Sequence, residues 1–218
     1  MFSKGKNTIF VNIKNLIVEN IIKYFKEYFL VTIIFVIGII IGVIFINNLS
    51  ENQSNEISTY INSFLENIKN NNNFNYAELF KDSVIQNLVL VVTLWFVGAT
   101  LIGIPLVFAI VLFRGFCLGY TISAVMHVLG IPNGIVFVLT SMFLQNIIFI
   151  PAVIALAVSG IRLYHTVVKD RSSEGIKYAI IRHSVFSIVI LVLLIISSVI
   201  EVFCSTNLFV LCRNFIAI

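Results

Sequence analysis

Long apolar stretches alternate with short polar segments along this chain. Between Val84 and Val158 the only Asp, Glu, Lys or Arg is Arg114. Because a membrane-spanning helix takes about 17–25 mainly apolar residues, this stretch has room for three spans, and the apolar segments that flank it add two more. The pattern predicts an all-α fold, a polytopic transmembrane helical bundle. The five predicted spans cover residues 28–46, 84–113, 116–129, 135–158 and 184–200.

Composition supports a membrane protein. Hydrophobic residues make up 59% of the chain and charged residues only 11%, whereas soluble domains carry about 25% charged residues. We therefore expect residues 1–218 to form a single integral membrane domain in contact with lipid. The net charge of +4 at pH 7 comes from lysines and arginines that flank the spans, so we do not expect nucleic acid as a partner.

The lysines and arginines are distributed unevenly between the two sides of this arrangement. Eleven of the 14 fall in a lead at residues 1–27, at Arg114, or in a loop at residues 159–183. Basic residues collect in cytoplasmic segments of membrane proteins. We therefore expect these segments inside the cell, which places the N-terminus inside, the C-terminus outside, and residues 47–83 in an outer loop.

The same distribution suggests an interpretation of Arg114. A guanidinium at the centre of a bilayer costs at least about 2.5–3.5 kcal/mol on insertion scales. We therefore expect Arg114 in a short cytoplasmic turn between the second and third spans, with Gly115 easing the bend. The alternative is a re-entrant hairpin that holds Arg114 within the protein.

The two ends of the chain have amphipathic character. Apolar side chains recur at helical spacing from Ile9 to Tyr28, with lysines interleaved. A basic amphipathic helix of this kind lies on the inner leaflet, although the segment could also simply lead into the first span. We expect the apolar tail, residues 202–218, to lie on the outer leaflet. Cys204 and Cys212 could pair there if the tail faces an oxidising space.

Two pairs of glycines lie four residues apart in predicted spans. Gly38 and Gly42 belong to the first span, and Gly115 and Gly119 lie at the start of the third. Small residues at this spacing let helix backbones approach closely. Packing within one chain is favoured over dimerisation, although a homo-oligomer stays open.

Glycines and prolines also indicate irregular helix geometry. Gly98, Gly103 and Pro105 in the second predicted span, and Pro151 in the fourth, indicate kinks or local unwinding, which neighbouring helices can satisfy. The segment GIPNG at residues 130–134 is a turn signal on the outer face.

Two amides, Gln145 and Asn146, lie near the middle of the fourth predicted span. Such side chains usually donate a hydrogen bond to a neighbouring helix. The alternative is that they bind a substrate.

The outer loop at residues 47–83 is the only sizeable polar segment. It contains five acidic residues and many asparagines, yet part of it is amphipathic. The apolar side chains that share one helix face are Ile57, Ile61, Phe64, Leu65 and Ile68. This face could form a docking surface for a partner outside the membrane, or the loop could be a solvated connector packed on the membrane.

The sequence lacks the groups that catalysis in a membrane requires. No Asp or Glu lies inside a predicted span, and Glu201 lies at the outer edge of the fifth. No zinc-protease, serine-hydrolase or phosphate-binding motif occurs. Ser123 and His127 share a helix face, but nothing supplies an oxyanion hole. We therefore expect neither an enzyme nor a bound cofactor or metal.

Three segments resemble the hallmark segments of the stage II sporulation protein M family. They are WFVGATLIGIPLVF (Trp95–Phe108), FRGFCLGYT (Phe113–Thr121) and QNIIFIPA (Gln145–Ala152). The order of spans and loops agrees with this resemblance over most of the chain. Many wider relatives carry an acid between the outer turn and the proline–alanine pair, and this chain lacks it.

The resemblance implies a membrane scaffold at the sporulation septum. Members of the family are expected to hold stage II sporulation proteins P and D, a cell-wall amidase and a lytic transglycosylase, while the septal wall is thinned and the forespore is engulfed. The outer loop, GIPNG and the C-terminal tail would then form the partner surface. The alternative, a membrane subunit of a small-solute transporter or channel, rests on Pro105, Pro151 and the Gln145–Asn146 pair.

Overall fold

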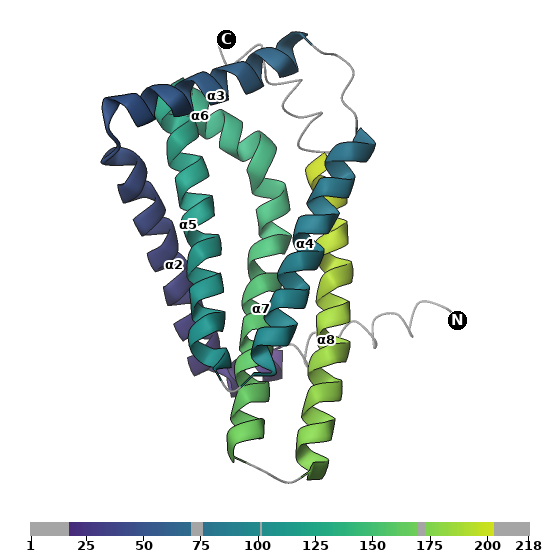
Figure 1. Cartoon of the computed structure of the whole chain (residues 1–218). Coiled ribbons are helices and arrows are strands. Elements are labelled where there is room, and N and C mark those ends of the chain that lie inside the picture. Colours follow the sequence, from purple (N-terminus) through teal and green to yellow (C-terminus); the bar gives the residue numbers. More distant parts are fainter. Residues whose placement is uncertain (1–17, 71–75, 101, 170–172, 203–218) are drawn as a thin grey trace.

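The computed structural model describes residues 18–70, 76–100, 102–169 and 173–202. The described chain is helical almost throughout (Figure 1). Its elements follow in the order α2 (Phe25–Asn47), α3 (Glu51–Asn70), α4 (Tyr76–Gly98), α5 (Gly103–Leu129), α6 (Ile131–Phe137), the π-helical segment η1 (Val138–Met142), α7 (Phe143–Lys169) and α8 (Ser173–Ile200).

Five of these helices are long and apolar enough to cross a membrane: Phe25–Asn47, Tyr76–Gly98, Gly103–Leu129, Phe143–Val168 and Gly175–Ile200. They run side by side as a bundle, and α3 lies across one end of it (Figure 1). The prediction of an all-α, five-span fold is confirmed. Residues of the amphipathic lead before 18, the tail after 202 and the Cys204–Cys212 pair lie outside the described part of the chain.

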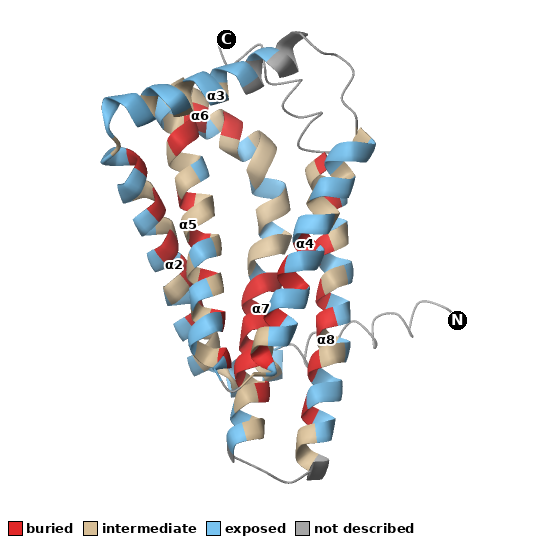
Figure 2. Ribbon diagram, in the orientation of Figure 1, coloured by how far each residue is buried: buried red, intermediate tan, exposed pale blue. Residues whose placement is uncertain are grey.

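The central helix of the bundle is α7, which contacts α2, α4, α5 and α8. Val153, Leu156 and Ala157 on α7 are fully buried. Figure 2 shows the buried positions on the facing sides of the spans, while the outward sides are exposed. Those outward sides are apolar, with Phe29 and Ile188 about 60% exposed, as lipid-facing helices require.

Helices α2 and α5 form the most extensive helix–helix contact of the described chain, and their backbones approach closely. A β-carbon at Gly42 would lie 2.7 Å from the Tyr120 nitrogen, and one at Gly119 would lie 2.8 Å from the Ile39 Cα. Gly38 and Gly115 contact the partner backbone in the same way. The structure therefore brings the two predicted glycine pairs together within one chain.

The prediction that Arg114 lies in a turn is wrong. Residues 103–129 form one continuous helix, α5, with Arg114 inside it, so the predicted spans 84–113 and 116–129 are replaced by Tyr76–Gly98 and Gly103–Leu129. The break falls between Gly98 and Gly103. Pro105 stands in the first turn of α5, where a missing N–H is not needed, and does not kink a span.

The predicted fourth span, 135–158, is also wrong in its bounds. Gly130 has φ 77°, and α6 begins directly after it with a proline in its first turn. The chain then passes through η1 into α7, whose membrane-spanning part is Phe143–Val168. Only Gly130 acts as a turn in GIPNG. Thr140 and Ser141 bond back to carbonyls of Val136 and Phe137, and such bonds commonly accompany a widened helical turn.

The predicted cytoplasmic loop, 159–183, consists largely of helix. The structure continues α7 to Lys169 and starts α8 at Ser173. These two helices extend beyond the others at that end of the bundle (Figure 1). Residues 159–183 contain several charged side chains at the ends of these two helices, which is why a hydropathy pattern predicts a loop there.

The bundle has two chemically different ends. We call the end covered by α3 the capped end, and the end where α2 begins and α7 connects to α8 the basic end. Five lysines and arginines lie in residues 1–27 and five in residues 162–182, which are the sequence segments that lead to the basic end. With Arg114 inside α5, ten of the 14 basic residues belong to these segments.

Candidate functional site at the capped end

Helix α3 is amphipathic and lies on the capped end with its apolar side inward. Ile61 packs against the buried side chains of Val125 on α5 and Phe137 on α6. Near the start of α3, Ser54 Oγ lies 3.0 Å from His127 Nε2. One apolar and one polar contact therefore attach α3 to the bundle.

The structure separates the predicted docking residues into two groups. Ile57 and Ile61 are half-buried on the inward side of α3, so the sequence-based docking face at these positions is turned towards the bundle. The side chains of Phe64, Leu65 and Ile68 lie outside the described part of the chain.

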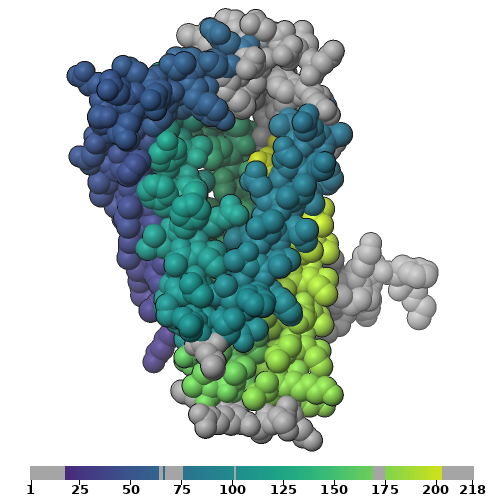
Figure 3. All heavy atoms as spheres, in the orientation of Figure 1, coloured from purple at the N-terminus to yellow at the C-terminus, as the bar shows by residue number. Residues whose placement is uncertain are grey.

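The other face of α3 is polar and open. Tyr60 is 75% exposed, and acidic side chains on the same helix are also exposed. The exposed residues of α3 are Glu51, Asn52, Gln53, Asn55, Glu56, Thr59, Tyr60, Asn62, Ser63 and Glu66. We call these residues the outer face of α3. In the space-filling view, α3 lies along part of the capped end (Figure 3).

Beneath α3, a polar network joins three spans near the capped end. Asn87 on α4 donates to Ser198 Oγ on α8 at 2.8 Å. Ser83, one turn earlier on α4, lies 2.8 Å from Ser198 Oγ and donates to Glu201. Gln145 at the start of α7 donates to the same Glu201 carboxylate at 2.7 Å. We call these five residues the polar network.

Of the five members of the network, sequence reasoning singled out only Gln145 and missed the other four. Gln145 reaches α8, whereas Asn146 donates to the Met142 carbonyl of its own helix turn at 2.8 Å. Ser83 and Asn87, four residues apart in an apolar helix, share a helix face. That spacing was the available signal for the α4 side of the network.

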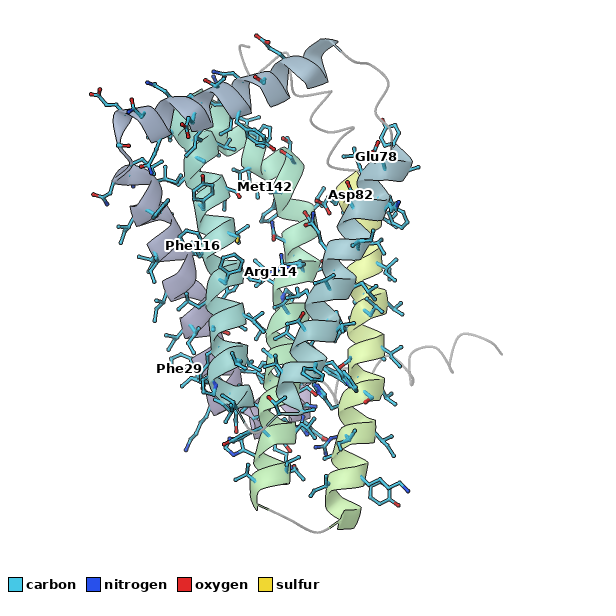
Figure 4. The ribbon with its side chains drawn as sticks, viewed as in Figure 1. Phe29, Glu78, Asp82, Arg114, Phe116 and Met142 are labelled. Atoms are coloured by element: carbon cyan, nitrogen blue, oxygen red, sulfur yellow. The ribbon has the colours of Figure 1, made fainter. Side chains whose placement is uncertain are left out.

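Glu201 is the only acidic residue of the network. It stands one residue beyond the span Gly175–Ile200, and burial raises the pKa of its carboxyl, while the hydrogen bond from Ser83 acts in the opposite direction. Two further acids, Glu78 and Asp82, lie on α4 at the same end (Figure 4). The capped end is therefore acidic.

Arg114 is a charged side chain within a span. It is the twelfth residue of α5, about 16 Å along a helix that rises 1.5 Å per residue, and Figure 4 shows it about midway along the bundle. It is half-buried, and its Cζ lies 5.9 Å from the centre of the Phe149 ring on α7. Within the described residues no carboxylate pairs with it. An intramembrane arginine is a functional candidate by default.

A buried histidine occupies the opposite half of the bundle. His183 is 2% exposed and lies on α8, not in the predicted loop. Its Nδ1 is 2.9 Å from Ser159 Oγ, and its Nε2 has no hydrogen-bond partner among the described residues. Gly98 and Gly160 approach each other beside it, since a β-carbon at Gly98 would lie 2.8 Å from the Gly160 Cα. We interpret the site as close helix packing.

The described residues contain no group of three or more His, Cys, Asp or Glu side chains that could hold a metal ion. Ser123 and His127 share a face of α5, and the contact found for the His127 ring is with Ser54 Oγ of α3. The capped end offers an exposed polar helix surface and a hydrogen-bonded network, an arrangement suited to binding.

Comparison with known proteins adds a family. The family model described as stage II sporulation protein M matches residues 31–206, which include most of α2 and all elements from α3 to α8. No curated protein and no solved structure matches the chain significantly.

Proposed function

The chain belongs to the stage II sporulation protein M family, and on that premise we propose that it is a non-enzymatic membrane scaffold for peptidoglycan hydrolases. Its partners would be stage II sporulation proteins P and D, an amidase and a lytic transglycosylase. Held at the sporulation septum, they would thin the septal wall and drive engulfment of the forespore. Five apolar helices and the family make this a multi-pass membrane protein.

The proposal requires a particular orientation. Basic segments are retained in the cytoplasm, and ten lysines and arginines belong to the segments that lead to the basic end. Lys69 and Lys81 belong to the segments of the capped end, and Arg213 lies outside the described part of the chain. We therefore place the basic end inside the cell and the capped end outside it, where cell-wall hydrolases act.

The observation that carries the scaffold proposal is the outer face of α3. It is a polar surface about 24 Å long, from the 16 residues between Glu51 and Glu66 at 1.5 Å each, and it is fixed to the bundle by Ile61 and by the Ser54–His127 contact. A pre-fixed surface loses little entropy on binding. Tyr60, with a large amphipathic ring in open solvent, is the side chain of α3 best suited to anchor a partner.

The proposal changes the docking surface that the sequence suggested. Since Ile57 and Ile61 are turned inward, the partner would contact the polar side of α3. GIPNG contributes α6, which lies at the same end beside α3 (Figure 1).

Affinity capture tests the proposal. Tagged protein from sporulating cells should recover peptidoglycan hydrolases, and replacement of Tyr60, Glu51 and Glu56 by alanine should reduce that recovery at equal protein level. Asp82→Asn, an exposed acid at the same end but on α4, provides the matched control. Recovery that is unaffected by the α3 changes would remove α3 as the partner surface.

A second candidate function is a subunit of a small-solute transporter or channel. Two observations favour it: Arg114 lies within a span beside Phe149, and the surface is hollowed between α5 and α4 below α3 (Figure 3). A solute path through this region would use Arg114 and the polar network. Replacement of Gln145 and Asn146 by leucine should then abolish transport, whereas a variant that stays folded and supports sporulation would remove this candidate.

A further inference from the structure

A cavity of about 250 Å³ opens at the basic end, the end of the bundle away from α3. Its lining comes from the start of α2 and from the parts of α7 and α8 near their connection. The lining residues are Tyr24, Glu27, Arg162, His165, Thr166 and Arg182. This volume is several times the roughly 30 Å³ that one water occupies, so it has room for a polar group of several atoms.

Arg162 is held in a fixed position in this cavity. Its Cζ stacks 3.7 Å above the centre of the Tyr24 ring, and its Nη1 donates to Asn20 Oδ1 at 3.2 Å. Tyr24 lies at a break between two helical segments, residues 18–23 and α2. The Tyr24 ring faces Arg162 of α7. A guanidinium has five N–H donors, and the bond to Asn20 leaves most of them for another acceptor.

A second guanidinium, that of Arg182 on α8, lines the same cavity. Within the described residues neither arginine forms an ion pair, although Glu27 also lines the cavity. Two arginines and one carboxylate give the cavity a charge of about +1 when His165 is neutral. Like charges at one site repel each other, so an anion between the two guanidinium groups would lower the energy of the arrangement.

The ligand chemistry follows from these groups. Paired guanidinium groups fit the tetrahedral oxygens of a phosphate, to which they donate in bidentate fashion. The hydroxyl oxygens of Tyr24 and Thr166 add polar atoms to the wall. A phosphodiester carries one negative charge, which matches the balance of two arginines against Glu27.

The surroundings of the cavity favour a lipid as the source of that phosphate. On α2, Phe25 and Phe29 stack with ring centres 5.9 Å apart and are 60% and 57% exposed. Phe25 directly follows Tyr24, and Glu27 lies between the two phenylalanines in the first turns of α2. An apolar surface next to a basic pocket at the end of spanning helices is the environment of a phospholipid, and such pockets bind headgroups.

We propose that the cavity lined by Arg162 and Arg182 binds the phosphate of a phospholipid headgroup at the basic end. The two guanidinium groups hold the phosphate oxygens, and Tyr24 fixes Arg162. Glu27 lowers the net positive charge of the cavity, so that a headgroup with one negative charge matches it. The acyl chains lie along the apolar outer side of α2. Bound lipid would add a bridge between α2, α7 and α8 across the cavity.

The test uses the full chain, purified in dodecyl maltoside and phosphate-free buffer, with phosphatidylglycerol added and bound lipid counted by native mass spectrometry. We expect about one retained lipid per chain. R162Q/R182Q should lower the occupancy about tenfold. K26Q/K177Q removes the same charge from exposed positions outside the cavity and should retain lipid as the unmodified chain does.

Two further variants make the result independent of folding. E27Q removes the one carboxylate among the described residues that line the cavity, and it should lower the phosphatidylglycerol concentration needed for half occupancy, which misfolding cannot cause. R162K/R182K keeps the charge but not the paired donors, and should bind at an intermediate level. Equal losses in R162Q/R182Q and K26Q/K177Q would overturn the proposal, because binding would then follow net charge alone.

Inorganic phosphate separates the two sources of this chemistry. If the headgroup is the ligand, millimolar phosphate should displace phosphatidylglycerol only weakly. If inorganic phosphate binds and phosphatidylglycerol does not, the lipid assignment is overturned and the cavity is a site for soluble phosphate.

Discussion

Gly119 of α5 lies so close to Ile39 of α2 that a β-carbon on the glycine would stand 2.8 Å from the Ile39 Cα. Since real β-carbons are essentially never closer than 3.0 Å to such an atom, even alanine at this position forces the two helices apart. The contact is between backbones, so no side-chain rotation can relieve it. This pair of helices positions α3 at the capped end, because α3 follows α2 in the chain and packs on α5.

We therefore expect Gly119→Ala to destabilise the bundle by about 1–3 kcal/mol, the usual cost of overpacking. The free energy of unfolding in mixed micelles is the measurement. Ile40→Ala, on the lipid-facing side of α2 at 52% exposed, is the matched control and should change it much less. An unchanged value for Gly119→Ala would mean that the α2–α5 contact is looser than the structure gives.

Glu201 should make stability depend on pH. Burial raises the pKa of its carboxyl in the folded chain, so the folded state binds the proton more tightly than the unfolded state does. Stability is then greatest below the pKa of an unfolded glutamate, about 4.3, and falls as the pH rises towards the raised pKa. Above that pKa it is constant.

Thermal unfolding of the unmodified chain and of Glu201→Gln, between pH 4 and pH 8, measures this effect. The glutamine variant should lack this contribution and show a flatter profile over the range. Parallel profiles for the two proteins would contradict the assignment of the carboxyl to a buried network with Ser83 and Gln145.

Arg114 should cost more than it contributes to stability. A cation above an aromatic ring contributes about 0.5–2 kcal/mol, whereas an arginine in the bilayer centre costs at least about 2.5–3.5 kcal/mol. Arg114→Met, which keeps the length of the side chain, should therefore leave the free energy of unfolding unchanged or raise it. Arg114→Lys keeps the charge as a control. A loss above about 1 kcal/mol in the methionine variant would assign Arg114 a structural role through Phe149.

The attachment of α3 can be loosened without unfolding the spans. Ile61→Ala removes apolar surface that covers Val125 and Phe137, and it should speed amide hydrogen exchange in α3 while exchange in α4 stays the same. Thr59→Ala, on the exposed side of α3, is the control. Equal exchange in all three proteins would show that α3 is held by other contacts.

The number of spans and the all-α fold follow from hydropathy, but the bounds of the inner spans do not. The sequence predicts a turn at Arg114 because a guanidinium is costly in lipid, yet α5 continues through this residue. The true break contained its own signals, Gly98, Gly103 and Pro105. A window of apolar residues cannot show which of two weak interruptions ends a helix, because that depends on the packing of the neighbouring helices.

The candidate site was only partly accessible from the sequence. The amphipathic pattern of α3 predicts a helix with one apolar side, but not which side a partner meets, since that depends on the bundle beneath it. The sequence therefore predicted that Ile61 docks a partner, whereas in the structure Ile61 packs on Phe137. In the same way, Gln145 indicated a hydrogen bond to another helix, while the identity of its acceptor, Glu201, required the fold.

The most direct test of the scaffold account is quantitative affinity capture from sporulating cells. It compares the unmodified chain, the variant with alanine at Glu51, Glu56 and Tyr60, and the Asp82→Asn control, all at equal membrane levels. The account predicts that peptidoglycan hydrolases are recovered with the unmodified chain and with the control, and that recovery falls at least severalfold with the α3 variant. Recovery of an ATPase or a solute-binding protein in place of hydrolases would contradict it.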